Sequence, residues 1–378
     1  MEDIPKGLEE EEYFHGLLPR EDCNEILTRV GDFLVRVSQP RPTDPREVII
    51  SVRVSKEQSP QSVRLHLPIL EKSVLIKAIK RQPWEFSHDD ITLDKMLGQG
   101  AFGEVRSGEA KLTVTEAQMA FRKEKIKEMM HEARLMRRYD HDNIVRIYGV
   151  AVDREPLMIV IELIEGGCLS DELKLRKGNV SDDEKIDKMC LGAAYGLQYL
   201  HLKKCIHRDI AARNILYTKD KVAKISDFGM SREGTIYKMK TCKKVPIKWT
   251  APETIATFIY SLKTDVYSFS IMVCEVFTDG DEPYKGLSNT EVLLGKRMEI
   301  PQAPEGISSL IRHCWDQNPS SRWTMSIPKN IDAVTAIAVD SAKEINSPKK
   351  IVDSLKQNAL VKNSPSSPKK QHQSVIYL

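Results

Sequence analysis

Three oxygen-bearing side chains follow one another near the middle of the 378-residue sequence: Asp209, Asn214 and Asp227. A carboxylate such as that of Asp209 can orient a hydroxyl group and accept its proton. The side-chain oxygens of Asn214 and Asp227 suit magnesium, a hard cation that keeps few protein ligands when it also binds phosphates. Together these groups could direct a hydroxyl at a phosphate and hold the cation that neutralises the charge, which is the chemistry of phosphoryl transfer.

The residues around this trio form two motifs: the octapeptide His207-Arg208-Asp209-Ile210-Ala211-Ala212-Arg213-Asn214 and the triplet Asp227-Phe228-Gly229. In this order they resemble the catalytic loop and the metal-binding loop of protein kinases. The resemblance implies that Asp209 is the catalytic base and that Arg213 acts beside it. It also implies that Asn214 and Asp227 bind Mg²⁺. The alternative is a loop that holds two acids and an amide by chance, which the length of the motifs disfavours.

A glycine-rich segment precedes these motifs, at Leu97-Gly98-Gln99-Gly100-Ala101-Phe102-Gly103-Glu104-Val105. Glycines let backbone N–H groups approach phosphates without a side-chain clash. The spacing of the three glycines is weak support by itself, but here it opens the region that ends in the two motifs. By resemblance, these nine residues cover the phosphates of ATP, and the backbone near Glu162 binds its adenine.

The lysine with which protein kinases hold two of the ATP phosphates is not evident. Apolar residues recur at helical spacing over residues 126–136, and this predicted helix carries Glu132 where the family has the glutamate that pairs with that lysine. Lys111 follows the glycine-rich segment too soon for a hairpin of normal length, and Lys123 is expected on the same helix as Glu132. We take Lys111 as the candidate. We leave open that neither lysine serves, because much of one strand is missing from the sequence.

Two further segments favour tyrosine as the phosphate acceptor. Ala211 stands where kinases that act on serine and threonine usually carry a lysine, and residues 245–253 have the form found in tyrosine kinases. Tyr237 lies in the expected activation segment, where a phosphate on it could pair with Arg208 and nearby lysines. An ordinary exposed tyrosine is the alternative. The resemblance also pairs Glu253, at the end of that segment, with Arg322.

The region before the kinase-like part has strand-like alternation. Arg36 shares one face of a predicted strand with Ser38. A lone arginine on a strand is usually a solvated charge. However, the helix start at Pro19 and the later strands 48–52 and 63–67 follow the order of a Src-homology-2 domain, which this region resembles.

In that family the arginine corresponding to Arg36 binds phosphotyrosine through its planar fork. Arg20, Ser38 and His66 would line the same pocket. The region ends early, because such a domain normally has about 100 residues. The part that reads the residues after the phosphotyrosine is therefore expected to be absent.

The sequence divides into five parts. These are an acidic lead-in (1–12), a shortened Src-homology-2-like domain (13–82), a linker (83–90), a protein tyrosine kinase domain (91–337) and a basic tail (338–378). The order of the domains resembles the Fes/Fer family of non-receptor tyrosine kinases. The implied fold is α+β, with a two-lobed kinase fold, a shortened α+β domain before it and a disordered C-terminal tail.

Composition excludes several other classes. Apolar residues make up 41% and charged residues 29% of the sequence, which is typical of a soluble globular protein. No stretch is long and apolar enough to cross a membrane, and we expect no signal peptide and, with Glu2 as the second residue, no myristoyl anchor. The seven scattered cysteines fit reduced thiols in the cytoplasm.

The charge is unevenly distributed. From Ser341 onward seven lysines face Glu344 and Asp353, a net +5, so the rest of the chain carries about −2 of the total +3. This tail leaves open a peripheral association with the inner face of the plasma membrane, although a solvated tail is the simpler interpretation. We expect no nucleic acid among the partners.

The sequence leaves two functions open. The first is a non-receptor tyrosine kinase that uses ATP and Mg²⁺, acts on tyrosine-containing proteins and is recruited to phosphotyrosine proteins. The second is a catalytically impaired relative that works as a phosphotyrosine-binding adaptor. The intact Asp209, Asn214 and Asp227 favour the first, and the missing lysine strand favours the second.

Overall fold

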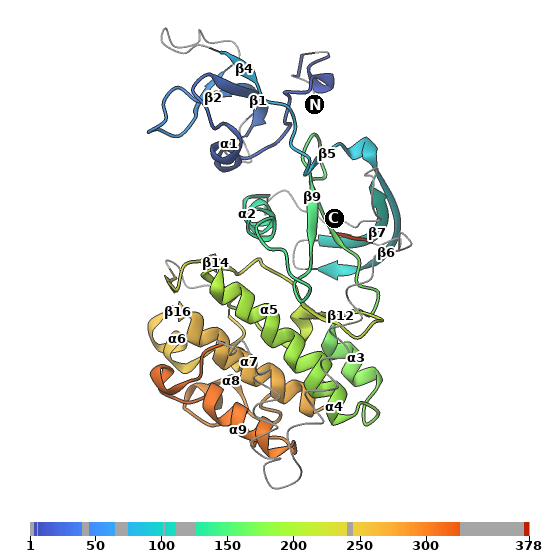
Figure 1. Cartoon of the computed structure of the whole chain (residues 1–378), viewed down its shortest axis with the longest axis vertical. Coiled ribbons are helices and arrows are strands. Elements are labelled where there is room, and N and C mark those ends of the chain that lie inside the picture. The colour runs from blue at the N-terminus through green and yellow to red at the C-terminus, as the bar shows by residue number, and fades with distance from the viewer. Residues whose placement is uncertain are drawn as a thin grey trace, which may run out of the picture. The chain divides into compact units, whose positions relative to one another are not determined.

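The computed structural model describes residues 4–5, 7–39, 45–64, 75–100, 103–110, 126–239, 245–325 and 374–377. The chain forms two compact units (Figure 1). The first unit comprises Met1–Asp140, Arg146–Leu163 and Gln371–Leu378, and the second comprises His141–Val145 and Ile164–Lys370. His66, Ala101, Phe102, Lys111 and Lys123 lie outside the described residues.

The first unit begins with a four-stranded sheet in the order β3-β2-β1-β4. Its strands are β1 (Asp32–Ser38), β2 (Glu47–Val52), β3 (Gln61–Arg64) and β4 (Lys77–Ala78), beside helix α1 (Arg20–Ile26) and the 3₁₀ turn η1 (Leu8–Glu10). Strands β1 and β2 are antiparallel, and their buried positions are rich in β-branched residues, which suit a pleated surface. Part of the acidic lead-in also packs here, because Ile4 and Leu8 contact the core cluster formed by Phe14, Val35 and Val37.

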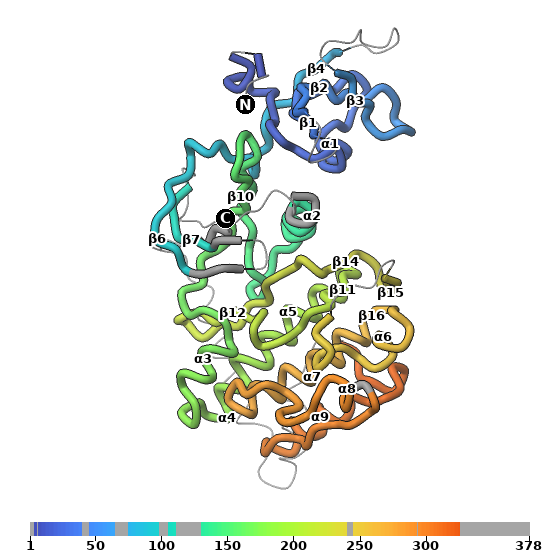
Figure 2. Tube along the Cα trace, turned by 180° about the vertical axis from the view of Figure 1, so that it is seen from behind, coloured from blue at the N-terminus to red at the C-terminus, as the bar shows by residue number. Residues whose placement is uncertain are grey.

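The first unit also contains a six-stranded sheet in the order β5-β9-β10-β17-β7-β6. Its strands are β5 (Glu85–Phe86), β6 (Ile91–Gly100), β7 (Gly103–Ala110), β9 (Ile147–Ala151), β10 (Met158–Glu162) and β17 (Ser374–Tyr377). Helix α2 (Ile126–Met136) and the 3₁₀ turn η2 (His88–Asp90) belong to the same unit, and Figure 2 labels α2 together with β6, β7 and β10. The helix predicted over residues 126–136 is confirmed.

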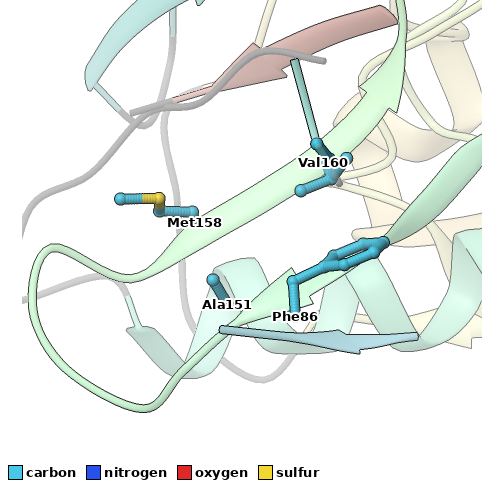
Figure 3. Close-up of a cluster of buried hydrophobic side chains, with 5 residues drawn as sticks. Phe86, Ala151, Met158 and Val160 are labelled. Carbon is cyan, nitrogen blue, oxygen red and sulfur yellow. The ribbon is translucent and has the colours of Figure 1, made fainter. Parts of the chain in front are cut away.

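A cluster of buried side chains connects several strands of this sheet. It consists of Phe86, Ala110, Ala151, Met158 and Val160 (Figure 3). Phe86 belongs to β5, which lies in the segment that the sequence assigned to a linker, so this segment is built into the sheet.

The second unit is mainly helical. Its helices are α3 (Leu169–Leu175), α4 (Asp182–Glu184), the π-helical turn η4 (Lys185–Cys190), α5 (Leu191–Leu202), α6 (Pro252–Thr257), α7 (Leu262–Phe277), α8 (Asn289–Leu293) and α9 (Glu305–Cys314). Three 3₁₀ turns accompany them: η5 (Ala212–Asn214), η6 (Ile247–Trp249) and η7 (Pro319–Ser321). Helix α7 is buried along almost its whole length, and other helices of the unit surround it (Figure 1).

The segments between these helices contain short strands that pair into two-stranded ladders. They are β11 (Cys205–Ile206) with β14 (Arg232–Glu233), β12 (Ile215–Tyr217) with β13 (Ala223–Ile225), and β15 (Ile236–Lys238) with β16 (Ile259–Ser261). The 207–214 loop lies between β11 and β12, and the Asp227-Phe228-Gly229 triplet follows β13. Because β12 pairs directly with β13, the fold brings both motifs to one place.

In the described part of the chain, no helix has both the length and the apolar character needed to span a membrane. The tail departs from expectation at one point. Residues 374–377 form strand β17, although the sequence predicted disorder there.

Candidate active site

A buried carboxylate of helix α7, that of Asp265, supports the start of the 207–214 loop. Asp265, in α7, accepts hydrogen bonds from the backbone N–H groups of His207 and Arg208, each at 2.8 Å. Arg208 has a φ of 73°, in the left-handed region that costs a non-glycine residue free energy. The two charge-assisted hydrogen bonds that Asp265 accepts stabilise this backbone conformation. They therefore fix the backbone position of the next residue, Asp209.

Asp209 is held by two residues of its own loop. The side-chain Nδ2 of Asn214 donates to the backbone oxygen and to Oδ2 of Asp209, both at 2.8 Å. The guanidinium of Arg213 forms an ion pair with Oδ1 of Asp209. Because the amide nitrogen of Asn214 faces Asp209, its amide oxygen is the atom that it can offer to a cation.

Asp227 lies in a buried position with unusual electrostatics. Its φ is 56°, and its Oδ1 accepts a hydrogen bond of 3.2 Å from the backbone N–H of Gly229. Burial, and then the negative charge of Asp209, raise the pKa of the Asp227 carboxyl. A divalent cation beside both carboxylates would offset this repulsion, so the hard oxygen donors of Asp227 and Asn214 fit Mg²⁺.

Among the described residues, no group of three or more His, Cys, Asp or Glu side chains is arranged to hold a metal ion. The candidate ligands of magnesium stay those from the sequence, Asn214 and Asp227, and magnesium that also binds phosphates keeps few protein ligands.

Direct contacts between the 207–214 loop and the residues around Asp227 hold the two motifs in fixed relative positions. Phe228 is fully buried, and its ring meets that of His207 edge-on, at 5.1 Å between centroids. The Oγ of Ser226 donates to the backbone oxygen of Asn214 at 2.9 Å, and His207 Nε2 lies 3.1 Å from the backbone oxygen of Ser226. The relative position of Asp209 and Asp227 is thus set by packing and hydrogen bonds within one unit.

A second carboxylate of α7 supports the loop and was not found by sequence reasoning. Glu275 Oε2 accepts hydrogen bonds from the backbone N–H of Ala212 and from the indole N–H of Trp249, both at 2.9 Å. Burial raises the pKa of Glu275 to about 7. The Arg213 guanidinium lies 4.4 Å from the centroid of the Trp249 ring. Glu275 therefore connects the 207–214 loop to the 245–253 segment.

Tyr237 lies on β15, directly opposite Tyr260 of β16. The guanidinium of Arg208 lies 4.6 Å from the centre of the Tyr237 ring, and that of Arg232 lies 5.5 Å from it. Two arginines thus surround the ring. Of the lysines expected nearby, Lys240, Lys243 and Lys244 lie outside the described residues.

The predicted pair of Glu253 and Arg322 is confirmed. Two nitrogens of the Arg322 guanidinium donate to the two carboxylate oxygens of Glu253, each at 2.7 Å. Arg322 is almost completely buried, and its Nε donates to the backbone oxygen of Asp316 at 2.7 Å. This bidentate pair fixes the end of the 245–253 segment to the C-terminal part of the second unit.

The described residues of the glycine-rich segment lie at the paired ends of two strands in the first unit. In the β6–β7 ladder, Gly98 is opposite Val105, Gln99 is opposite Glu104 and Gly100 is opposite Gly103. Leu97, just before these pairs, is exposed.

Two other residues expected near ATP belong to the same unit. Glu132 is buried in α2, and Glu162 ends β10, where its backbone N–H donates to the oxygen of Arg146 at 2.8 Å.

Comparisons with known proteins agree with this geometry. Residues 91–330 match the family model described as protein tyrosine and serine/threonine kinase. The chain is 37% identical over 367 residues to Fer-related kinase 1 of Caenorhabditis elegans, which covers 85% of this chain and 93% of that protein. It is also 37% identical over 356 residues to human tyrosine-protein kinase Fer, covering 84% of this chain and 43% of Fer. The chain belongs to the Fes/Fer-like protein-tyrosine kinases.

The viral relative shows the same level of similarity. The transforming protein Fps of avian sarcoma virus, strain PRCII, is 37% identical over 356 residues, which is 85% of this chain and 67% of that protein. The chain thus spans less than half of human Fer but nearly all of the nematode relative. For this Fes/Fer-like kinase, the family assignment confirms the two-lobed kinase fold that the motifs implied.

A second candidate site lies on the N-terminal sheet of this kinase. Arg36 is buried, and its Nε donates to Ser51 Oγ at 3.0 Å, while its other nitrogens donate to the backbone oxygen of Leu18 at 3.2 Å and to Ser62 Oγ at 3.4 Å. Burial is the largest cause that lowers the pKa of Arg36, and the charge of Arg20 lowers it further. Arg20 and Arg36 therefore lie close enough for their positive charges to repel each other. A bound anion would reduce this repulsion.

Ser51 and Ser62 are hydrogen-bond partners of Arg36 that sequence reasoning missed. They are opposite one another in the β2–β3 ladder, and their hydroxyl oxygens are 3.2 Å apart. Knowledge of the strand pairing would have indicated them, since Ser51 is also opposite Leu34, on the face that holds Arg36. Ser38 lies on the same face but is not among the partners of Arg36.

The second unit also contains a cavity of about 290 Å³. It is lined by Thr250, Pro252, Ile255, Ala256, Tyr267, Val292, Gly295, Arg297 and Gln317. The lining includes none of the residues predicted for catalysis or for metal binding.

Proposed function

We propose that this chain transfers the γ-phosphate of ATP to tyrosine hydroxyl groups in protein substrates. The observation that carries the proposal is the arrangement of Asp209, which Asn214 and Arg213 hold in place beside the buried Asp227. Phosphoryl transfer requires such a placement, because a protein lowers the activation barrier of this reaction mainly by positioning the reactants and stabilising their charge.

Each residue then has a defined part. Asp209 orients the acceptor hydroxyl and takes up its proton. Asn214 and Asp227 would hold Mg²⁺, which supplies positive charge next to the phosphates when it is bound. By resemblance, backbone N–H groups of the glycine-rich segment would cover the phosphates. Arg213 keeps Asp209 in position through their ion pair.

The choice of tyrosine rests on the segments near Asp209. Ala211 leaves the site without the lysine that kinases acting on serine and threonine carry there. Glu275 fixes Trp249 against Arg213, which would give the substrate a defined surface beside the base. The names of the relatives, tyrosine-protein kinase Fer among them, support the same acceptor.

Recruitment to phosphotyrosine proteins is the second part of the proposal. Arg36 presents a buried guanidinium beside two serine hydroxyls, with Arg20 near enough to affect its pKa. This group of donors suits a phosphate. A cytoplasmic location fits the six described cysteines, none of which is joined in a disulfide.

A catalytically impaired adaptor is the second candidate. Strand β17 fills the position between β7 and β10 in the sheet, and its sequence, Ser374-Val375-Ile376-Tyr377, contains no lysine. This strand therefore supplies no lysine at its own position, and Lys111 and Lys123 lie outside the described residues. A sequence that lacks the usual lysine strand would hold the α- and β-phosphates less well, which is why the adaptor remains the second candidate.

Magnesium-dependent transfer of phosphate from ATP to a poly-Glu/Tyr substrate distinguishes the two candidates. We expect transfer by the full chain, loss of at least 100-fold in Asp209→Asn, and no change in Asp220→Asn, an exposed acid of the same unit. A folded chain with no more activity than Asp209→Asn would rule out the kinase and support the adaptor.

The phosphotyrosine site is tested separately by fluorescence anisotropy. A labelled phosphotyrosine peptide should bind the full chain, and its unphosphorylated form should not. Arg36→Lys keeps the charge but removes the fork, so we expect affinity to fall at least 10-fold. Arg29→Ala, at an exposed position of the same domain, serves as the control. Equal binding by Arg36→Lys and the unaltered chain would contradict the assignment.

A further inference from the structure

The position of the C-terminal strand is unusual. Strand β17 comes from residues 374–377, yet it lies inside the six-stranded sheet and not at an edge. On one side it pairs antiparallel with β10, where Ile376 is opposite Val160. On its other side it pairs antiparallel with β7, where the same Ile376 is opposite Arg106. In Figure 3 this strand, in faded red, runs beside the green strand β10.

The pairing covers both edges of β17. Four residues of β17, Ser374 to Tyr377, are opposite residues of β10, and three, Val375 to Tyr377, are opposite residues of β7. The segment is β-branched and aromatic at its last three positions, a composition that favours strands. Backbone pairing of this kind resembles the addition of a peptide strand to a sheet.

The rest of the sheet depends on this strand for its continuity. In the described part of the chain, β6 pairs with β7, and β5 pairs with β9, which pairs with β10. Among the described strands, the two groups are joined only through β17. Without it, β7 and β10 would each present an edge with unpaired N–H and C=O groups.

The packing of the buried side chains also depends on this strand. The cluster contains Ala110 from β7 together with Phe86, Ala151, Met158 and Val160 from the other group of strands. Holding Ala110 within this cluster requires the two groups to stay a fixed distance apart. A strand between them sets that distance at two steps of about 4.8 Å each.

We propose that residues 374–377 are an intramolecular tail strand, and that β7 and β10 form an acceptor site for it. The site recognises an extended backbone by its N–H and C=O groups. Binding of the tail strand connects the glycine-rich hairpin to the rest of the sheet, so release of the tail loosens that hairpin. The inference does not depend on kinase activity, because it concerns the pairing of strands.

The length of the chain permits this arrangement. Residues 326–373 connect the last described residue of the second unit to the tail strand. At about 3.3 Å per residue, such a connection can span on the order of 150 Å, so its reach sets no limit. The same length would permit a second copy of the chain to donate the strand, which the experiment below separates from the intramolecular case.

Hydrogen exchange with mass spectrometry tests the proposal. Two variants remove the pairing: a chain that ends at Gln373, and Ile376→Pro in the full chain, since proline lacks an N–H and breaks a central strand. In both, amides of β6, β7 and β10 should exchange at least 10-fold faster, while those of α5 and α7 stay unchanged. Ile376→Val is the matched control and should behave like the unaltered chain.

A synthetic peptide of residues 373–378 supplies the second readout. Added to the shortened chain, it should bind and restore slow exchange in β7 and β10, and the same peptide with proline for Ile376 should not. Unchanged exchange after deletion of the tail would overturn the proposal. Protection that appears in the full chain only at concentrations where dimers form would overturn the intramolecular assignment, because a second copy would then be the donor.

Discussion

Asp22 and Arg134 form a bidentate ion pair between the first helix of the chain and the helix that carries Glu132. The Nε and one terminal nitrogen of Arg134 donate to the two carboxylate oxygens of Asp22, at 3.2 and 2.7 Å. Asp22 is completely buried and also accepts a hydrogen bond of 2.9 Å from Arg137. The Arg137 guanidinium in turn stacks 3.6 Å from the centre of the Trp84 ring. Arg134 of α2 is thus anchored to α1, and Arg137, just after α2, is anchored to both α1 and Trp84.

Removing this carboxylate should loosen α2. We expect Asp22→Ala to destabilise the first unit by about 3 kcal/mol, because it leaves two arginines without their buried partner. Urea unfolding followed by hydrogen exchange of the α2 amides measures the effect. Glu25→Gln is the control, since Glu25 pairs with Arg138 at a more exposed position, where about 0.5 kcal/mol is expected. Equal effects of the two substitutions would contradict the anchoring role of Asp22.

Asp265 should matter for both stability and catalysis. Asparagine at this position keeps one acceptor oxygen for two backbone donors, His207 and Arg208, and loses the charge. We expect Asp265→Asn to cost about 2 kcal/mol and to lower phosphate transfer, because the left-handed backbone before Asp209 loses support. Thermal unfolding and the transfer assay measure these effects. Asp183→Asn, on the exposed surface of α4, should change neither; a variant of Asp265 that keeps full stability would refute the role.

The raised pKa of Glu275 should make the stability of the protein depend on pH. Its pKa is raised to about 7 in the folded protein, above an ordinary value near 4.5. Glu275 therefore binds its proton more tightly in the native state than in the unfolded state. The contribution of this protonation to stability is fully present below pH 4.5 and is lost as the pH rises through about 7. Relative to Glu275→Gln, the unaltered chain should lose up to about 3 kcal/mol of stability between pH 4.5 and pH 8.

Glutamine is a suitable replacement because both donors, from Ala212 and Trp249, bind the same oxygen of Glu275. Urea unfolding of both chains at intervals of half a pH unit gives the comparison. A difference in stability that stays constant over this range would show that Glu275 does not titrate there.

Magnesium should stabilise the nucleotide-bound kinase through Asp227. With ATP present, addition of Mg²⁺ should raise the melting temperature of the unaltered chain, and at a ligand concentration of 100 Kd the stabilisation is about 2.7 kcal/mol. Asp227→Asn should lose most of this magnesium-dependent increase, while Asp220→Asn should keep it. The measurement is a thermal shift with ATP and either Mg²⁺ or EDTA. A full increase in Asp227→Asn would place the cation elsewhere.

Sequence motifs predicted much of the candidate site. Asp209, Asn214 and Asp227 were found because their chemistry depends on residue type and short spacing, which a linear sequence preserves. The helix over residues 126–136 and the strands of Arg36 and Glu162 were found because apolar periodicity reflects local geometry.

The contacts that supporting residues make could not be predicted in this way. Asp265 and Glu275 act on a loop more than fifty residues earlier in the sequence, and Ser51 and Ser62 reach Arg36 only through the pairing of strands. No local pattern marks such partners, because a buried polar side chain is recognised by what the fold brings to it.

The sequence by itself determined the chemical groups and the family of this kinase, since both rest on contiguous motifs. Only the tertiary structure decided which distant groups support them and how the small sheet is completed. The tail makes the difference clear. From the sequence its last residues were expected to belong to a disordered chain end, yet as β17 they lie between β7 and β10. Strand pairing is governed by the open edges that the rest of the fold offers, and those edges exist only after folding.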